Sequence, residues 1–149
     1  MAMNDIIGKA VVLTGNDAIG YGSEGDTIFG VVTKVEKAGN LTAYPLNYQG
    51  ATGSATFKID SSTQGVLDSS ATDTYVATVE FNKMFEKIPI TSTAAKQPSA
   101  GNIVVADGSG GLVKLASLAV TNSAVSVVGL NAIATSVNTT DNTATIKVL

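Results

Sequence analysis

Apolar and polar residues alternate along most of this chain in short runs, which is the periodicity of β-strands. In the run 74–81 (TYVATVEF), every second residue from Tyr75 to Phe81 is apolar and falls on one face. The run 41–48 is predicted as an irregular edge strand, because Pro45 cannot donate to a strand ladder. The pattern predicts further strands over 9–14, 27–36, 51–59, 102–106, 112–115, 132–137 and 143–149.

Turn-forming residues separate these runs at intervals of about 8–12 residues, which is typical of all-β sandwiches and barrels. The segment 107–111 (DGSGG) predicts a tight hairpin between its two flanking strands. Evidence for helix is thin. Residues 82–87 can form one turn before Pro89 stops it, and the β-branched residues of 117–128 favour a strand.

The predicted fold class is therefore all-β: a compact antiparallel β-barrel or β-sandwich with long loops and at most one short helix. The long loops are 60–73, which is rich in Ser, Thr and Asp, and 91–101, which contains Pro98. Neither loop has the biased composition of a linker, so residues 9–149 are predicted to form a single β domain. Residues 1–8 are predicted to be a flexible N-terminal arm.

Composition removes most kinds of reaction chemistry. Charged residues make up 14% of the 149 residues, against about 25% in an average soluble protein. All nine basic residues are lysine, and histidine, cysteine and tryptophan are absent. A Ser-His-Asp triad, the usual zinc, haem and iron–sulfur ligands, and bidentate arginine clamps on phosphate are therefore excluded. The sequence predicts a protein that is not an enzyme and has no cofactor and no catalytic or metal-binding residues.

Charge and hydropathy also bear on partners. The net charge of −3 and the isoelectric point near 4.7 disfavour binding to a phosphate backbone, so no nucleic-acid partner is expected. The apolar run at 10–13 is too short for a signal-peptide core or a membrane span. We therefore expect a protein made in the cytoplasm, without a membrane partner.

Two glycine-rich segments resemble each other. The first matches the G-x-G-x-x-G pattern of dinucleotide-binding loops, but a strand-like run follows it where that fold requires a helix. Both segments are therefore predicted to be turns of β-hairpins, and the likeness between them favours common turn chemistry over internal duplication. The glycines concerned are Gly20, Gly22 and Gly25 in the first segment and Gly108, Gly110 and Gly111 in the second.

The acidic residues of the loops lack the D-x-D-x-D-G spacing of a local calcium loop. They are Glu24, Asp26, Asp60, Asp68 and Asp73. The default prediction is a solvated loop, and a calcium site assembled from separate loops stays open as the alternative.

Charge is scarcest in the C-terminal part of the chain. From residue 88 to residue 149, the ionisable side chains are Lys96, Asp107, Lys114, Asp141 and Lys147. The surface of a monomer usually carries about a quarter to a third charged residues, whereas the cores of protein interfaces are depleted in charge. This deficit predicts a homo-oligomer.

Three patches of the chain resemble the small capsid decoration (cement) proteins of tailed bacteriophages. Residues 9–36 (KAVVLTGNDAIGYGSEGDTIFGVVTKVE) are similar to the opening of that family: a strand, a turn, a glycine-rich segment with Gly-Asp, and an apolar strand ending in Val-Glu. Residues 101–114 resemble its later V-V-x-D-G-x-G hairpin, and 132–149 resemble its C-terminal end. The stretch 51–90 matches no part of that pattern, and its role is unassigned.

The resemblance implies an all-β virion protein, with a homotrimer favoured, that docks on the major capsid protein outside an icosahedral head and stabilises the shell. It implies no catalytic residues. The arm, through Ile6 and Ile7, is then predicted to add as a strand to an edge of the capsid protein. Two alternatives stay open: a carbohydrate- or ligand-binding β module on a virion or cell surface, and a structural subunit of a tail or tube.

Overall fold

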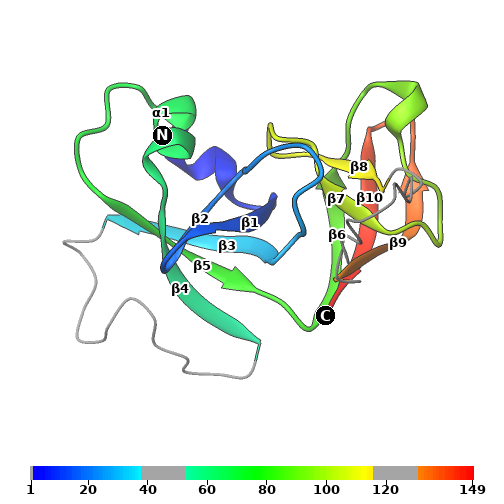
Figure 1. Cartoon of the computed structure of the whole chain (residues 1–149), viewed down its shortest axis with the longest axis horizontal. Coiled ribbons are helices and arrows are strands. Elements are labelled where there is room, and N and C mark those ends of the chain that lie inside the picture. The colour runs from blue at the N-terminus through cyan, green and yellow to red at the C-terminus, as the bar shows by residue number, and fades with distance from the viewer. Residues whose placement is uncertain (1, 38–52, 116–130) are drawn as a thin grey trace, which may run out of the picture.

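The computed structural model describes residues 2–37, 53–115 and 131–149 of the chain. The N-terminal half folds into a closed barrel whose strands follow the order β1-β2-β4-β5-β3 (Figure 1). Neighbouring strands are antiparallel, except that β2 and β4 run parallel. The strands are β1 (Ala10–Gly15), β2 (Ala18–Gly20), β3 (Gly30–Lys37), β4 (Ser54–Ile59) and β5 (Tyr75–Glu80).

The C-terminal half contains a three-stranded sheet of order β6-β10-β9 and a two-stranded sheet of β7 and β8. These strands are β6 (Lys83–Pro89), β7 (Val104–Ala106), β8 (Leu112–Lys114), β9 (Ala132–Asn138) and β10 (Thr143–Val148). Single bridges join the two sheets at both ends: Ile103 pairs with Ile133, and Ile90 pairs with Leu112. These two bridges therefore connect the two small sheets beside the barrel.

The predicted compact all-β class is confirmed, and the described residues contain one short α-helix. The hairpin predicted around 107–111 is the β7–β8 pair, in which Val105 lies opposite Val113. The sequence predicted antiparallel pairing throughout, and the parallel pair of β2 and β4 departs from it. The strand predicted over 41–48 and the one favoured over 117–128 lie outside the described residues.

Two local predictions are wrong. The stretch 60–73, predicted as a loop, contains the helix α1 (Ser61–Leu67), which begins where the Asp60 carboxylate accepts a hydrogen bond from Thr63 N at 2.7 Å. In the stretch 82–87, which the sequence allowed to form one helical turn, residues 83–87 belong to β6 instead, because pairing with β10 provides backbone hydrogen bonds. In the described part of the chain, no helix is both long and apolar enough to cross a membrane.

The predicted flexible arm also differs from the structure. Residues Ala2–Ile6 form a 3-10 helix, η1, and the side chains of Met3 and Ile6 are fully buried in the hydrophobic cluster inside the barrel. Burial removes these two apolar side chains from water, and this hydrophobic contact fixes the N-terminal segment against the barrel. Ile7, which is 44% exposed, is the one of the two predicted contact residues that remains at the surface.

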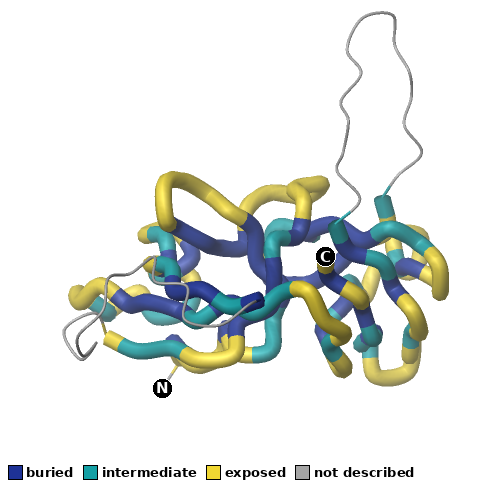
Figure 2. Tube along the Cα trace, turned by 90° about the horizontal axis from the view of Figure 1, so that it is seen from below, coloured by how far each residue is buried: buried dark blue, intermediate teal, exposed yellow. Residues whose placement is uncertain are grey.

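Two hydrophobic clusters organise the molecule, and buried segments run through the centre of both halves (Figure 2). One cluster fills the barrel and includes Ile6 and Val11. The other includes Val12 and Val31 from the outside of the barrel, together with Ile146 from the C-terminal sheet. The barrel and the C-terminal half therefore share a hydrophobic core.

Candidate interaction surface

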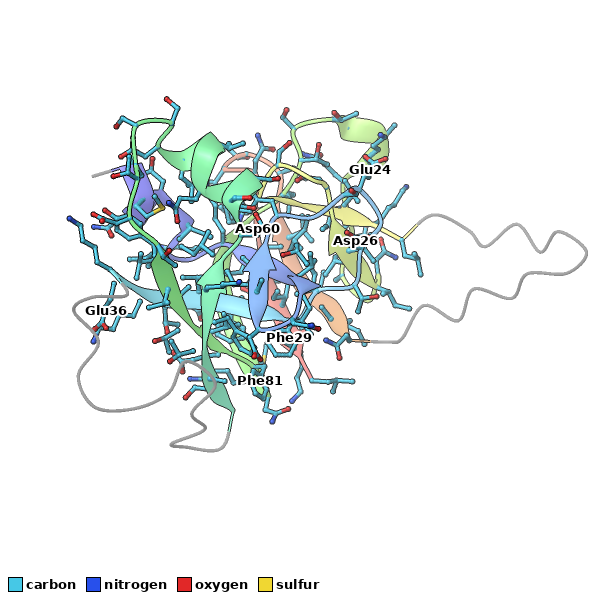
Figure 3. The ribbon with its side chains drawn as sticks, turned by 60° about the vertical axis from the view of Figure 1, so that its left-hand side comes forward. Glu24, Asp26, Phe29, Glu36, Asp60 and Phe81 are labelled. Carbon is cyan, nitrogen blue, oxygen red and sulfur yellow. The ribbon has the colours of Figure 1, made fainter. Side chains whose placement is uncertain are left out.

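The two glycine-rich segments lie against each other. Gly25 N donates to Ala106 O at 2.9 Å, and Ala106 N donates to Asp26 O at 3.0 Å. A Cβ placed on Gly108 would lie 3.2 Å from Glu24 N, so the two backbones are in direct contact. Figure 3 labels Glu24 and Asp26 on this loop, beside the yellow β7–β8 hairpin. The sequence identified both segments but gave no sign that they pair with each other.

Tyr21 packs its ring over Gly110. A Cβ on Gly110 would lie 2.9 Å from Tyr21 Cζ, and the φ angle of +96° favours glycine there independently. Lys9 lies beside both residues: its Cδ would be 3.2 Å from the same Cβ, and its Nζ lies 5.5 Å from the ring centroid and donates to the phenol oxygen at 3.4 Å. Glycine at position 110 therefore serves close packing between the barrel and the hairpin, which is a role the sequence pattern did not reveal.

The environment of Tyr21 keeps its phenol protonated. Burial, followed by the negative charges of Asp5 and Asp107, raises the pKa of Tyr21 to about 12. The Asp107 carboxylate is itself occupied, because its Oδ1 accepts hydrogen bonds from Ser109 N at 2.6 Å and from Gly111 N at 3.0 Å. The Asp107 hydrogen bonds therefore hold the hairpin turn in place, and burial keeps the Tyr21 phenol protonated at neutral pH.

Gly20 and Gly22, the first two glycines of the G-x-G-x-x-G match, occupy crowded positions. Gly20 lies in β2, where a Cβ would meet the side-chain oxygens of Asp60 and Thr63 within 3 Å. Gly22 has a φ angle of +64°, and a Cβ there would meet Val12. Strand β3 follows the segment, so the helix that a dinucleotide-binding loop requires is replaced by a strand.

The acidic loop residues are separated by their own local partners. Asp60 caps α1, and Asp73 forms an ion pair with Lys37 at 3.4 Å. Asp68 accepts hydrogen bonds from the hydroxyl and the backbone N–H of Ser70, which lower the pKa of its carboxyl. Within the described residues, no group of three or more acidic side chains is placed to hold a metal ion.

A shallow apolar depression of about 250 Å³ opens beside the paired glycine loops. The ion pair between Lys96 and Glu24, at 2.9 Å, crosses its rim. The depression is lined by Glu24, Gly25, Ala95, Lys96, Val105, Val113, Lys114 and Leu115. Its apolar floor suits an apolar side chain, and it holds no set of groups arranged for catalysis.

Aromatic side chains gather at the barrel without forming a flat platform. The Phe29 ring meets the Phe57 ring edge-on, with centroids 5.2 Å apart, and lies 5.4 Å from the Phe81 ring (Figure 3). All three are half-buried, because they also pack against the two hydrophobic clusters. Rings packed in this way stabilise the barrel and offer little flat surface on which a sugar could stack.

The outward face of the β6–β10–β9 sheet carries the second depression of interest. Both neighbours of β10 slip by one residue near Thr145, and Lys87 at this bulge has a φ angle of +57°. A groove of about 380 Å³ opens at the bulges. It is lined by Glu86, Lys87, Ser136, Val137, Asn138, Asp141, Thr143, Ala144 and Thr145.

Comparison of this chain with protein-family models, with curated proteins and with solved structures finds no match. The functional argument therefore rests on the residues and their geometry. The sequence predicted the hairpin turn at 107–111 correctly, whereas the first glycine segment is not a hairpin turn, because Gly20 lies in β2 and the segment joins β2 to β3, which do not pair. Sequence reasoning missed the contact of Tyr21 with Gly110 and the groove, because both depend on strand register rather than on any local pattern.

Proposed function

We propose that this protein is a structural component of a bacteriophage virion that binds the outside of the capsid and stabilises the head. In this proposal it acts as a homo-oligomer, with a trimer favoured, and its partner is the major capsid protein. It is not an enzyme and carries no cofactor. The observation that supports the proposal best is how the three segments that resemble capsid decoration proteins are arranged in the fold.

Those three segments build one hydrophobic core together. The cluster that joins the barrel to the C-terminal half draws nearly all of its buried members from 9–36, 101–114 and 132–149. Its members from these segments are Ala10, Val12, Ile28, Val31, Val104, Ala106, Leu112, Ala132, Ala134, Ala144, Ile146 and Val148. Gly/Asp turns recur in many unrelated β proteins. Segments that pack on one another form a structural unit, and a family resemblance is expected to follow such a unit.

A protein of this kind stabilises a shell through binding alone. A ligand that binds the assembled shell and not its separated subunits stabilises the assembly by RT ln(1 + [L]/Kd), which is about 2.7 kcal/mol per site at a hundredfold excess over Kd. This mechanism requires surface complementarity and no reactive group. The C-terminal half is rich in hydroxyl groups and poor in charge. Removing such neutral groups from water costs less free energy than removing charged groups.

The direct test uses capsids assembled from the major capsid protein of the same phage without decoration protein. We expect saturable co-sedimentation of this chain with expanded heads, and a higher temperature of shell dissociation measured by light scattering. Unassembled capsid protein is the control, and we expect weaker binding to it. Failure to bind heads at saturating concentration would contradict the proposal. Rings or filaments of the pure protein in electron micrographs would favour a tail or tube subunit, and specific binding on a glycan array would favour a carbohydrate-binding module.

A further inference from the structure

We propose that the outward face of the β6–β10–β9 sheet is the surface through which copies of this chain bind one another. The inference deepens the proposed function, since it rests on the oligomer that the function requires and assigns that oligomer a surface. It names a second copy of this chain as the occupant of the groove.

Strand register defines the residues of this face. Along β10, Ala144, Ile146 and Val148 are buried, so the alternate residues point outward. Lys147 pairs with Met84 on β6 and with Ile133 on β9, which places these three side chains in one row across the sheet.

The next rows are neutral and hydroxyl-rich. Thr145 pairs with Ser136, and Thr143 pairs with Asn138, so four uncharged polar side chains follow the first row. These four side chains share the outward face with the apolar side chains of Met84 and Ile133. On β10, the central strand of this sheet, Lys147 is the one charged residue.

Apolar exposure points to the same face. Met84 is 52% exposed, and the half-buried Ile133 lies in the same row. Met is a flexible side chain that is enriched at protein interfaces. Covering this row with a second copy would remove its apolar surface from water at about 25 cal/mol per Å².

The charges around the groove complement one another. Glu86, Asp141 and Lys87 line the groove, and Lys147 is exposed in the neighbouring row. The ion pairs found among the described residues involve none of these four side chains. Two charges of each sign on one face allow that face to bind a copy of itself, because Lys147 of one copy can approach Glu86 of another. A partner of strongly positive or strongly negative charge gains no net attraction from such a face.

The test compares charge reversal with charge restoration. Sedimentation equilibrium of the wild-type chain at about 100 µM, at which a complex with a micromolar Kd is almost fully formed, is expected to show an oligomer. The variants K147E and E86K are each expected to weaken self-association by at least about tenfold, because each places like charges opposite one another. The double variant K147E/E86K is expected to recover most of the wild-type association. K58E is the matched control, because Lys58 is also an exposed lysine on a strand but belongs to the barrel.

A second pair of variants tests the apolar row. M84D is expected to weaken association at least about tenfold, whereas V66D, at a 76% exposed valine on α1, is expected to leave it unchanged. All variants change exposed side chains, and equal urea midpoints would show that each is folded. A monomeric wild type, or unchanged association in both K147E and M84D, would overturn the inference. Head binding by a monomeric wild type would overturn the inference and the oligomeric state proposed above, but not the capsid-binding role. A wild-type oligomer that K147E disrupts but that binds no head would overturn the capsid-binding role and leave the inference standing.

Discussion

Gly20→Ala tests the packing that joins α1 to the barrel. Gly20 lies in β2, where the Cβ of alanine would fall within 3 Å of the side-chain oxygens of Asp60 and Thr63. Those two side chains are already committed: the Asp60 carboxylate accepts from Thr63 N at 2.7 Å, and Thr63 Oγ1 accepts from Tyr21 N at 3.1 Å. The added methyl group must therefore displace the start of the helix from the strand.

The magnitude follows from what that displacement breaks. Loss of the Asp60 cap costs about 1 kcal/mol, and loss of the buried hydrogen bond to Thr63 costs about another 1 kcal/mol. A total near 2 kcal/mol also agrees with the roughly 1–3 kcal/mol that overpacking costs in folded cores. Gly65→Ala is the matched control, because Gly65 lies within α1 and a Cβ there meets nothing within 4 Å. It is expected to stabilise the fold by about 0.5–1 kcal/mol, since alanine favours helix over glycine.

Urea denaturation followed by circular dichroism measures both effects. With a slope of about 1–3 kcal/mol per molar urea, Gly20→Ala should lower the midpoint by roughly 1 M, and Gly65→Ala should raise it slightly. The slopes should remain equal to that of the wild type, so that the midpoints report stability alone. A Gly20→Ala midpoint equal to or above the wild-type value would refute the close contact between β2 and α1. A drop as large in Gly65→Ala would show that any added methyl group in this region is harmful.

Three further predictions address the N-terminus and the glycine loops. Ile6→Ala should cost about 2–5 kcal/mol because Ile6 is fully buried, whereas Ile7→Ala should cost far less; equal costs in thermal unfolding would contradict the packed N-terminal helix. The pKa of Tyr21 is about 12 in the folded protein against 10 in the unfolded chain, so its contribution to stability is intact below pH 10 and is lost between about pH 10 and 12. Unfolding curves at stepped alkaline pH should show a smaller loss of stability in Tyr21→Phe than in the wild type. An equal loss in both proteins would contradict the raised pKa. Asp107→Ala leaves the backbone N–H groups of the hairpin turn without their acceptor, so it should cost about 1–2 kcal/mol and speed amide exchange there, and unchanged exchange would argue against the observed turn.

The strands could be predicted from sequence because their pattern is local. Alternation of apolar residues assigned β5 and both strands of the final hairpin, since period-two burial follows directly from the pleat. The helix α1 escaped prediction because its sequence, SSTQGVL, has no apolar stripe and only Thr63 is buried. Its stability comes from the Asp60 cap and from contacts with β2, which are properties of the fold and not of the segment.

The sequence did not predict contacts between segments that lie far apart along the chain. The N-terminal residues look like a frayed end in the sequence. Between Met1 and Gly8, only three apolar side chains are larger than alanine. Two of these, Met3 and Ile6, are buried in the barrel. The bulges beside β10 could not be predicted either. The residues at the register shifts, such as Glu86, Lys87 and Thr145, are neither glycine nor proline, so the sequence does not mark them. Register between distant strands decides both features.

The structure shows where the few charged side chains of the C-terminal part lie. Of its few ionisable side chains, Asp107 is used within its own turn and Lys96 is paired with Glu24. Two of those that remain, Asp141 and Lys147, lie at the groove and in the row beside it. On a surface so poor in charge, each unpaired charge weighs heavily in the choice of partner, because few others compete with it. Reversing Lys147 at this face should therefore change association more than reversing Lys58, because Lys58 lies on β4 of the barrel and outside the proposed contact face.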